Sequence, residues 1–296
     1  MIHSSSDSSG TFTTTDSRST LPLRWPAEHG AWGILLVPCF SSAAVAGGWN
    51  LPLLFFLFCM LALFLLRGSV ESYRASGARW TIVFAPVHAL LLVVSCSTGL
   101  ALMWVYGRWQ LIGVSAAGGL LYFGQRALVT AHSSQRAEKR SLVAELVGVA
   151  LLTLSAPGAW IALRGSLSRT ALEIWFLCLL FFAGGVLYVK YRVRGVLAHK
   201  RFDGFAERLA FAWPVLAYHL MLAAFLGILL LRPLTSDSST LRVAVLCLAF
   251  APAVLRAIAL LFRLGRRFAI PRLGWTEVAH SLLFMALVIL AYRLVA

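Results

Sequence analysis

Long apolar runs alternate with short polar segments along most of the chain. Each run is close to the ~20 residues that an α-helix needs to cross the hydrocarbon core of a membrane. The pattern predicts nine helices, over residues 29–47, 51–67, 80–104, 109–131, 142–163, 170–189, 206–231, 241–263 and 274–295. The run at 109–131 is the weakest, because it is Gly-rich and contains Gln125 and Arg126. We therefore expect an all-α, polytopic transmembrane helical bundle.

The polar segment that precedes the first run, residues 1–21, is rich in Ser and Thr and has no apolar stretch. It is predicted to be a disordered leader and not a signal peptide. Residues 22–296 are then expected to form a single integral membrane domain. The composition agrees, since 60% of the 296 residues are hydrophobic and only 12% are charged. These values exclude a soluble globular domain.

The formal net charge is +15, and the basic residues cluster between the apolar runs. This distribution indicates topology signals and contacts with lipid head groups, not a nucleic-acid surface. Of the 26 Lys and Arg residues, 20 lie before the first run or in every second connection after it, which places them on the same side of the membrane as the N-terminus. The positive-inside rule predicts a cytoplasmic N-terminus and an external C-terminus in a bacterial inner membrane. The expected partners are membrane lipids and no nucleic acid, and the sequence identifies no protein partner.

Ionisable residues inside the apolar runs follow this orientation. Most lie on helices that enter from the predicted cytoplasmic side, and mostly near that end: Glu28, His29, His88, Glu145, Glu207, Glu277 and His280. His219 is on such a helix as well, near the middle of the membrane. Such side chains are costly where they face lipid, so they are expected to face the bundle interior or a water-filled cavity. We infer a polar cavity open to the cytoplasm. The alternative is that each residue reaches the interface or forms a local hydrogen bond.

Basic residues at the predicted connections add a possible binding chemistry. Arg67 begins one connection, and Lys190, Arg192 and Arg194 begin another. Clustered guanidinium and ammonium groups hold phosphate or carboxylate by charge-assisted hydrogen bonds. Lys190, Arg192 and Arg194 are predicted to hold an anionic group, while His29, Glu145 and His219 are predicted to orient the head group or to move protons. The alternative is that the basic residues act as topology signals alone.

Three motifs carry a resemblance to a known family. They are Pro26-Ala-Glu-His29-Gly-Ala-Trp32 with Pro38, Tyr188-Val-Lys190 with Arg192 and Arg194, and the Tyr218-His219 pair. With them the chain resembles the YwiC-like family of bacterial membrane proteins over most of its length after residue 22. The resemblance implies a membrane protein and no particular reaction.

The predicted architecture also resembles the UbiA superfamily of intramembrane prenyltransferases. Those enzymes carry Asp-rich motifs in the connections after the second and sixth helices, where magnesium and an isoprenoid diphosphate are held. Here the same connections offer Glu71 in one, and Asp203 and Glu207 among six cations in the other. Magnesium needs several oxygen ligands at close quarters. The chain is thus at best a degenerate prenyltransferase-like enzyme, with direct cationic recognition of the head group and no metal or cofactor expected.

The leading hypothesis is a membrane protein that binds or processes a lipidic molecule, isoprenoid- or quinone-like, with an anionic head. One alternative is a proton-coupled transporter that uses intramembrane His and Glu residues. Another is a non-catalytic membrane assembly subunit. Haem or metal binding by the intramembrane histidines is less favoured, because no two are spaced i, i+4 on one helix and no Cys accompanies them.

Overall fold

The computed structural model describes residues 29–75, 86–130, 137–197, 202, 204–231, 237–264 and 270–294. Within these ranges the regular structure is entirely helical. The helices are α1 (His29–Ala46), α2 (Leu51–Ala75), α3 (Pro86–Trp104), α4 (Leu111–Thr130), α5 (Ala137–Thr153), α6 (Ser155–Arg164), α7 (Arg169–Leu197), α8 (Phe205–Leu231), α9 (Asp237–Arg263) and α10 (Ile270–Arg293). The predicted leader, residues 1–21, lies outside the described residues.

The helix count agrees with the prediction once α5 and α6 are treated together. Only Leu154 separates them, and they share the apolar stretch Leu142–Arg164. The described residues then contain nine helical segments, and the all-α polytopic helical bundle is confirmed. Seven apolar stretches in the described chain are long enough to cross a membrane. α4, which was predicted to be the weakest, is not among them.

Two helices continue well past their predicted ends. α2 runs to Ala75 and α7 to Leu197, so Arg67 and Lys190 lie on helices and not in connections. α7 has 29 residues, or ~43 Å at 1.5 Å per residue, against a hydrocarbon core of about 30 Å. An apolar run ends at the edge of the hydrocarbon, whereas helical hydrogen bonding continues through basic residues that reach the head groups. The predicted connections were therefore wrong at these two ends.

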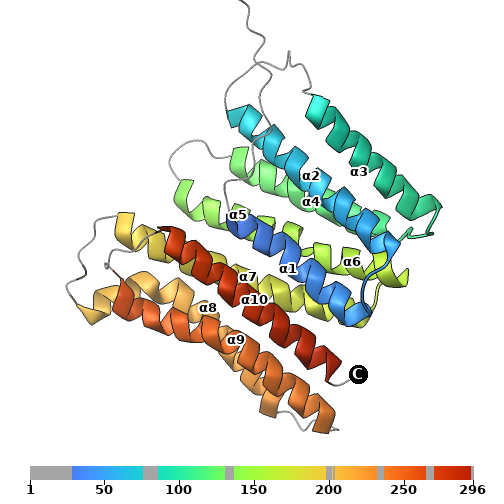
Figure 1. Ribbon diagram of the computed structural model, residues 1–296. Helices are drawn as coiled ribbons and strands as arrows, with labels where there is room; N and C mark the ends of the chain where they lie inside the picture. The colour runs from blue at the N-terminus through green and yellow to red at the C-terminus, as the bar shows by residue number, and fades with distance from the viewer. Residues whose placement is uncertain are drawn as a thin grey trace, which may run out of the picture.

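The helices lie side by side in a slanted row of neighbouring pairs (Figure 1). α2 packs on α3 and α4 packs on α5 at one edge, while α8 packs on α9 at the other. α1 and α10 lie next to each other between these edges, and α1 also contacts α5, α6 and α7. The middle of the described structure is therefore formed by α1 and α10, its first and last helices, packed against the central helices.

The largest buried cluster joins this middle to the α8–α9 edge. The rings of Phe181 on α7 and Phe284 on α10 stack with centroids 4.1 Å apart, and Phe250 on α9 meets Phe284 edge-on. α9 presents buried Ala249, Ala253 and Ala257 at four-residue intervals. Small residues at this spacing allow helix backbones to approach closely in a membrane bundle. The spacing explains how α9 can contact α7, α8 and α10 at once.

Candidate functional site

A cavity of about 1110 Å³ opens among six helices of the bundle. Its lining comes from residues 30–40 of α1, from residues 277–285 near the middle of α10, and from the later parts of α2, α4 and α7. α5 contributes residues 145–152, which lie in the first half of the apolar stretch Leu142–Arg164. The cavity thus lies toward one end of the bundle. That end contains the N-terminus of α1, which the charge distribution predicts to be cytoplasmic.

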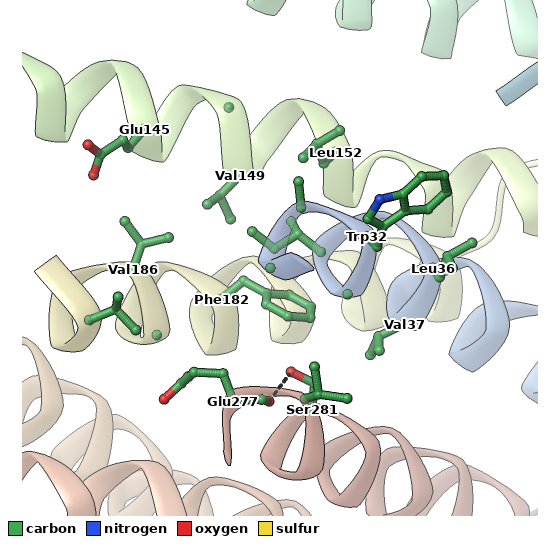
Figure 2. Close-up of a pocket in the computed structure, with 18 of the residues that line it drawn as sticks. Trp32, Leu36, Val37, Glu145, Val149, Leu152, Phe182, Val186, Glu277 and Ser281 are labelled. Atoms are coloured by element: carbon green, nitrogen blue, oxygen red, sulfur yellow. Dashed lines mark hydrogen bonds between the residues drawn. The ribbon is translucent and has the colours of Figure 1, made fainter. Parts of the chain in front are cut away.

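The walls of the cavity are mostly apolar, and its charged groups are set to one side. Figure 2 shows Trp32 and Leu36 on α1 and Leu152 on α5 toward one end of the view, and the carboxylates of Glu145 and Glu277 at the other. The Trp32 ring packs edge-on against Phe64 of α2, with centroids 5.0 Å apart. The cavity therefore has an apolar part and a charged part.

The first charged contact joins α5 and α7. Lys190 Nζ donates to Glu145 Oε1 at 2.8 Å. The Lys190 side chain is only 9% exposed, whereas that of Glu145 is 41% exposed. A buried ammonium group needs a counter-charge, because desolvation penalises an isolated cation. Glu145 supplies that charge and keeps part of its own surface open.

A second polar network crosses from α2 to α5. Arg67 Nη2 donates to Gln125 Oε1 at 2.9 Å, and Gln125 Nε2 donates to the carbonyl of Ala144 at 3.0 Å. Gly148 makes room for this amide, since a Cβ on Gly148 would lie 2.7 Å from Gln125 Nε2. Gln125, which marked only a weakness in the apolar pattern, therefore positions Arg67 at the cavity.

The third contact pairs α9 with α10. Arg256 Nη1 donates to Glu277 Oε1 at 2.5 Å, and the guanidinium lies 4.9 Å above the ring of Tyr188. The side chains are 7% and 21% exposed, respectively. Ser281 holds the same turn of α10 by donating to the Glu277 carbonyl at 2.8 Å, as drawn in Figure 2. Glu277 lines the cavity, and Arg256 lies behind it.

Four of the predicted site residues line this one cavity: Arg67, Glu145, Lys190 and Arg194. Arg194 follows Lys190 by one helical turn, and its guanidinium lies 5.6 Å from the centroid of the Tyr191 ring. His29 begins α1 next to the lining residue Gly30, but its side chain lies outside the described part of the structure. Their roles in binding remain predictions.

Arg192 and His219 are placed elsewhere. Arg192 is buried and donates to the carbonyl of Arg263, at the C-terminal end of α9, where a cation is favoured. His219 is 2% exposed, and its Nδ1 donates to the Val215 carbonyl at 2.8 Å. Its ring packs on Gly184 of α7, where a Cβ would lie 3.1 Å from Nε2. Neither residue lines the cavity.

The remaining ionisable residues do not form a metal-binding group in the described chain. His280 Nδ1 donates to the Thr276 carbonyl at 2.7 Å, a local contact of α10. No three His, Cys, Asp or Glu side chains gather as metal ligands among the residues that the structure describes. Glu28 and Asp203 lie outside those residues, and so does the side chain of Glu71.

Comparisons with known proteins agree with the motifs. The family model described as YwiC-like protein matches residues 25–160. The chain is similar to "Uncharacterized protein YwiC" of Bacillus subtilis (strain 168), with 28% identity over 271 residues. This alignment covers 90% of the chain and 96% of the relative. The resemblance to the YwiC-like family is therefore confirmed.

The YwiC-like match covers only part of the cavity. Residues 25–160 include Arg67, Gln125 and Glu145, whereas the lining residues of α7 and α10 follow the matched range. No solved structure matches the chain. The likeness to UbiA-type prenyltransferases therefore remains a prediction.

Proposed function

We propose that this protein binds a lipidic molecule with an anionic head, isoprenoid- or quinone-like, in the cavity among α1, α2, α4, α5, α7 and α10. The observation that supports this function is the division of one large intramembrane cavity into an apolar part and a charged part. An amphiphilic ligand has the same division.

The size and lining of the cavity favour a large apolar ligand. Small-molecule pockets usually have volumes of ~300–1,000 Å³ and mostly apolar walls with a few polar groups. The cavity of about 1110 Å³ slightly exceeds the upper limit of this range. Trp32, Leu36, Val149 and Phe182 would contact a hydrocarbon chain. Burial of that chain would supply most of the binding free energy.

The charges favour an anion at the polar end. The described lining contains three cationic side chains, Arg67, Lys190 and Arg194, against the carboxylates of Glu145 and Glu277. Because Lys190 is held by Glu145, the two arginines are the better contacts for phosphate or carboxylate oxygens. The head group would add to the contacts that these guanidinium groups already make.

Lipid extraction tests this function. Protein purified in mild detergent should retain a lipid with an anionic head and an isoprenoid or quinone-like body, detectable by mass spectrometry. Arg67→Ala with Arg194→Ala should lower its recovery at least several-fold, because both guanidinium contacts are lost. Arg169→Ala is the matched control, since Arg169 is exposed and pairs with Glu173 outside the cavity. Recovery of bulk phospholipid alone from all three proteins would contradict the proposal.

A proton-coupled transporter is the second candidate, and the two ion pairs at the cavity support it. Intramembrane carboxylates such as Glu145 and Glu277 commonly belong to proton or substrate pathways. This function predicts pH-driven uptake in proteoliposomes that Glu277→Gln abolishes. Absence of flux together with a retained lipid would favour the binding function. A co-purifying membrane protein without either result would instead indicate an assembly subunit.

A further inference from the structure

Arg256 is a buried cation that uses only part of its hydrogen-bonding capacity. Its Nη1 is bonded to Glu277, but Nε and Nη2 are buried without an acceptor in the part of the chain that the structure describes. A guanidinium group carries five N–H donors, and an unbonded buried donor is costly. A further acceptor at Nη2 would therefore be stabilising.

Gly185 leaves space for such an acceptor at the cavity wall. This glycine of α7 lines the cavity, as does Glu277. A methyl group built on Gly185 would lie 3.5 Å from Arg256 Nη2 and 3.6 Å from Glu277 Oε2. A small group that enters beside Gly185 would contact Oε2 and, after a small shift of the buried Arg256 side chain, Nη2 as well.

Arg256 Nη2 and Glu277 Oε2 determine which chemical group can bind beside Gly185. Nη2 can only donate, and the carboxylate oxygen Oε2 can only accept. An ether or ketone oxygen satisfies Nη2 and leaves Oε2 unbonded, and a second anion is repelled by Glu277. A hydroxyl group accepts from Nη2 and donates to Oε2. We propose that Gly185, Arg256 and Glu277 form a second polar subsite of the cavity that binds a hydroxyl group of the ligand.

This inference rests on the proposed function and narrows its ligand. Gly185 precedes Arg194, one of the two arginines assigned to the head group, by nine residues, which is about 13.5 Å along the helix axis. The Arg194 side chain shortens this distance, because long side chains on a helix lean toward its N-terminus. The ligand is then an amphiphile whose hydroxyl group lies several carbon atoms from its anionic head. A hydroxylated or quinol-like body fits this description, whereas a plain hydrocarbon chain does not.

A pair of compounds that differ only at the hydroxyl group tests the subsite. We choose hexadecanoate with a hydroxyl on its seventh carbon and the same acid with a methoxy group there. The hydroxy acid should bind the purified protein roughly tenfold more tightly, because hydrogen bonds to charged groups are among the stronger ones. Thermal shift titration measures both affinities. Equal affinities would show that the subsite holds water only and would overturn the proposal.

Substitutions at Gly185 give a second test that needs no ligand. Gly185→Ser places a hydroxyl group beside Nη2 and Oε2, whereas Gly185→Ala places only a methyl group there. The serine variant should unfold at a higher temperature than the alanine variant. Gly33→Ser and Gly33→Ala are the matched controls, since Gly33 lines the same cavity with no atom within 4 Å of its built Cβ. At Gly33 serine should give no advantage over alanine.

The two tests separate this subsite from the proposed function. In the Gly185→Ser protein the preference for the hydroxy acid should disappear, because the serine hydroxyl occupies the subsite. If serine and alanine are equivalent at Gly185, or if neither acid binds while an endogenous lipid is retained, the subsite is refuted and the lipid-binding function stands. If no lipid is retained and neither acid binds, the lipid-binding function fails and the ligand subsite fails with it, and a preference for serine at Gly185 then reports only on the Arg256–Glu277 pair.

Discussion

The ion pair between Arg256 and Glu277 allows an energetic prediction. Glu277→Leu removes the carboxylate that accepts from a guanidinium only 7% exposed. Breaking a buried pair from one side costs about 3–5 kcal/mol, because the remaining charge is left uncompensated. The lower end of this range applies here, since Glu277 is 21% exposed and the Tyr188 ring also stabilises the guanidinium.

The double substitution should recover most of this loss. Replacing a buried ion pair by apolar residues of similar size is often neutral or stabilising. Arg256→Leu with Glu277→Leu is therefore expected to lie within about 1–2 kcal/mol of the unaltered protein. The coupling free energy between the two positions should be about 2 kcal/mol or more, since residues in one salt bridge rarely act additively.

Equilibrium unfolding in mixed detergent micelles, followed by far-ultraviolet circular dichroism, measures the four free energies of the cycle. The Arg169–Glu173 pair is the control, because its arginine side chain is 93% exposed and its coupling should stay below about 1 kcal/mol. Additive effects of the two leucine substitutions would refute the reasoning. Such a result would mean that Arg256 is stabilised by solvent or by the Tyr188 ring without Glu277.

Two further predictions concern packing and orientation. Gly148→Ala should lower the unfolding temperature and cost about 1–3 kcal/mol, because its methyl group would displace Gln125, while Gly119→Ala should not destabilise, since Gly119 has open space around it. Equal unfolding temperatures for these two variants would contradict the account. Ser166→Cys should react with a membrane-impermeant maleimide in intact cells and Gly204→Cys only after permeabilisation, as the positive-inside rule predicts. The reverse labelling pattern would refute the orientation.

The fold could be predicted from the sequence because the hydrocarbon core sets the length of each apolar run. The runs at 206–231 and 241–263 agree closely with α8 and α9. The ends of α2 and α7 could not be predicted in this way. Hydropathy reports where the hydrocarbon ends, whereas a helix ends where its backbone loses hydrogen-bond partners or its residues disfavour helix.

The site was predictable only in part, because its residues meet through helix packing. Glu145 was a candidate because it is a carboxylate inside an apolar run, and Lys190 because it is a cation beside one. Their contact, however, joins residues 45 positions apart. Sequence separation of that kind carries no information about which helix faces meet. Arg192 was grouped with Lys190 because the two are close in the sequence. Residues two positions apart on a helix, however, point about 160° away from each other.

Arg256 was missed, although a usable signal was present. It lies within the apolar run 241–263 and was counted among the basic residues of a connection. Ionisable residues within the membrane generally face the bundle interior, so Arg256 could have been predicted to lie inside the bundle. His219 shows the limit of the same argument, since it is buried against α7 with a local hydrogen bond and does not line the cavity.

A cryo-electron microscopy map of the detergent-purified protein tests the central claim most directly. The account predicts elongated density in the cavity, with its head beside Arg67 and Arg194 and its body along Trp32 and Phe182. A cavity that contains only isolated water-sized peaks, in a map that resolves these side chains, would contradict it.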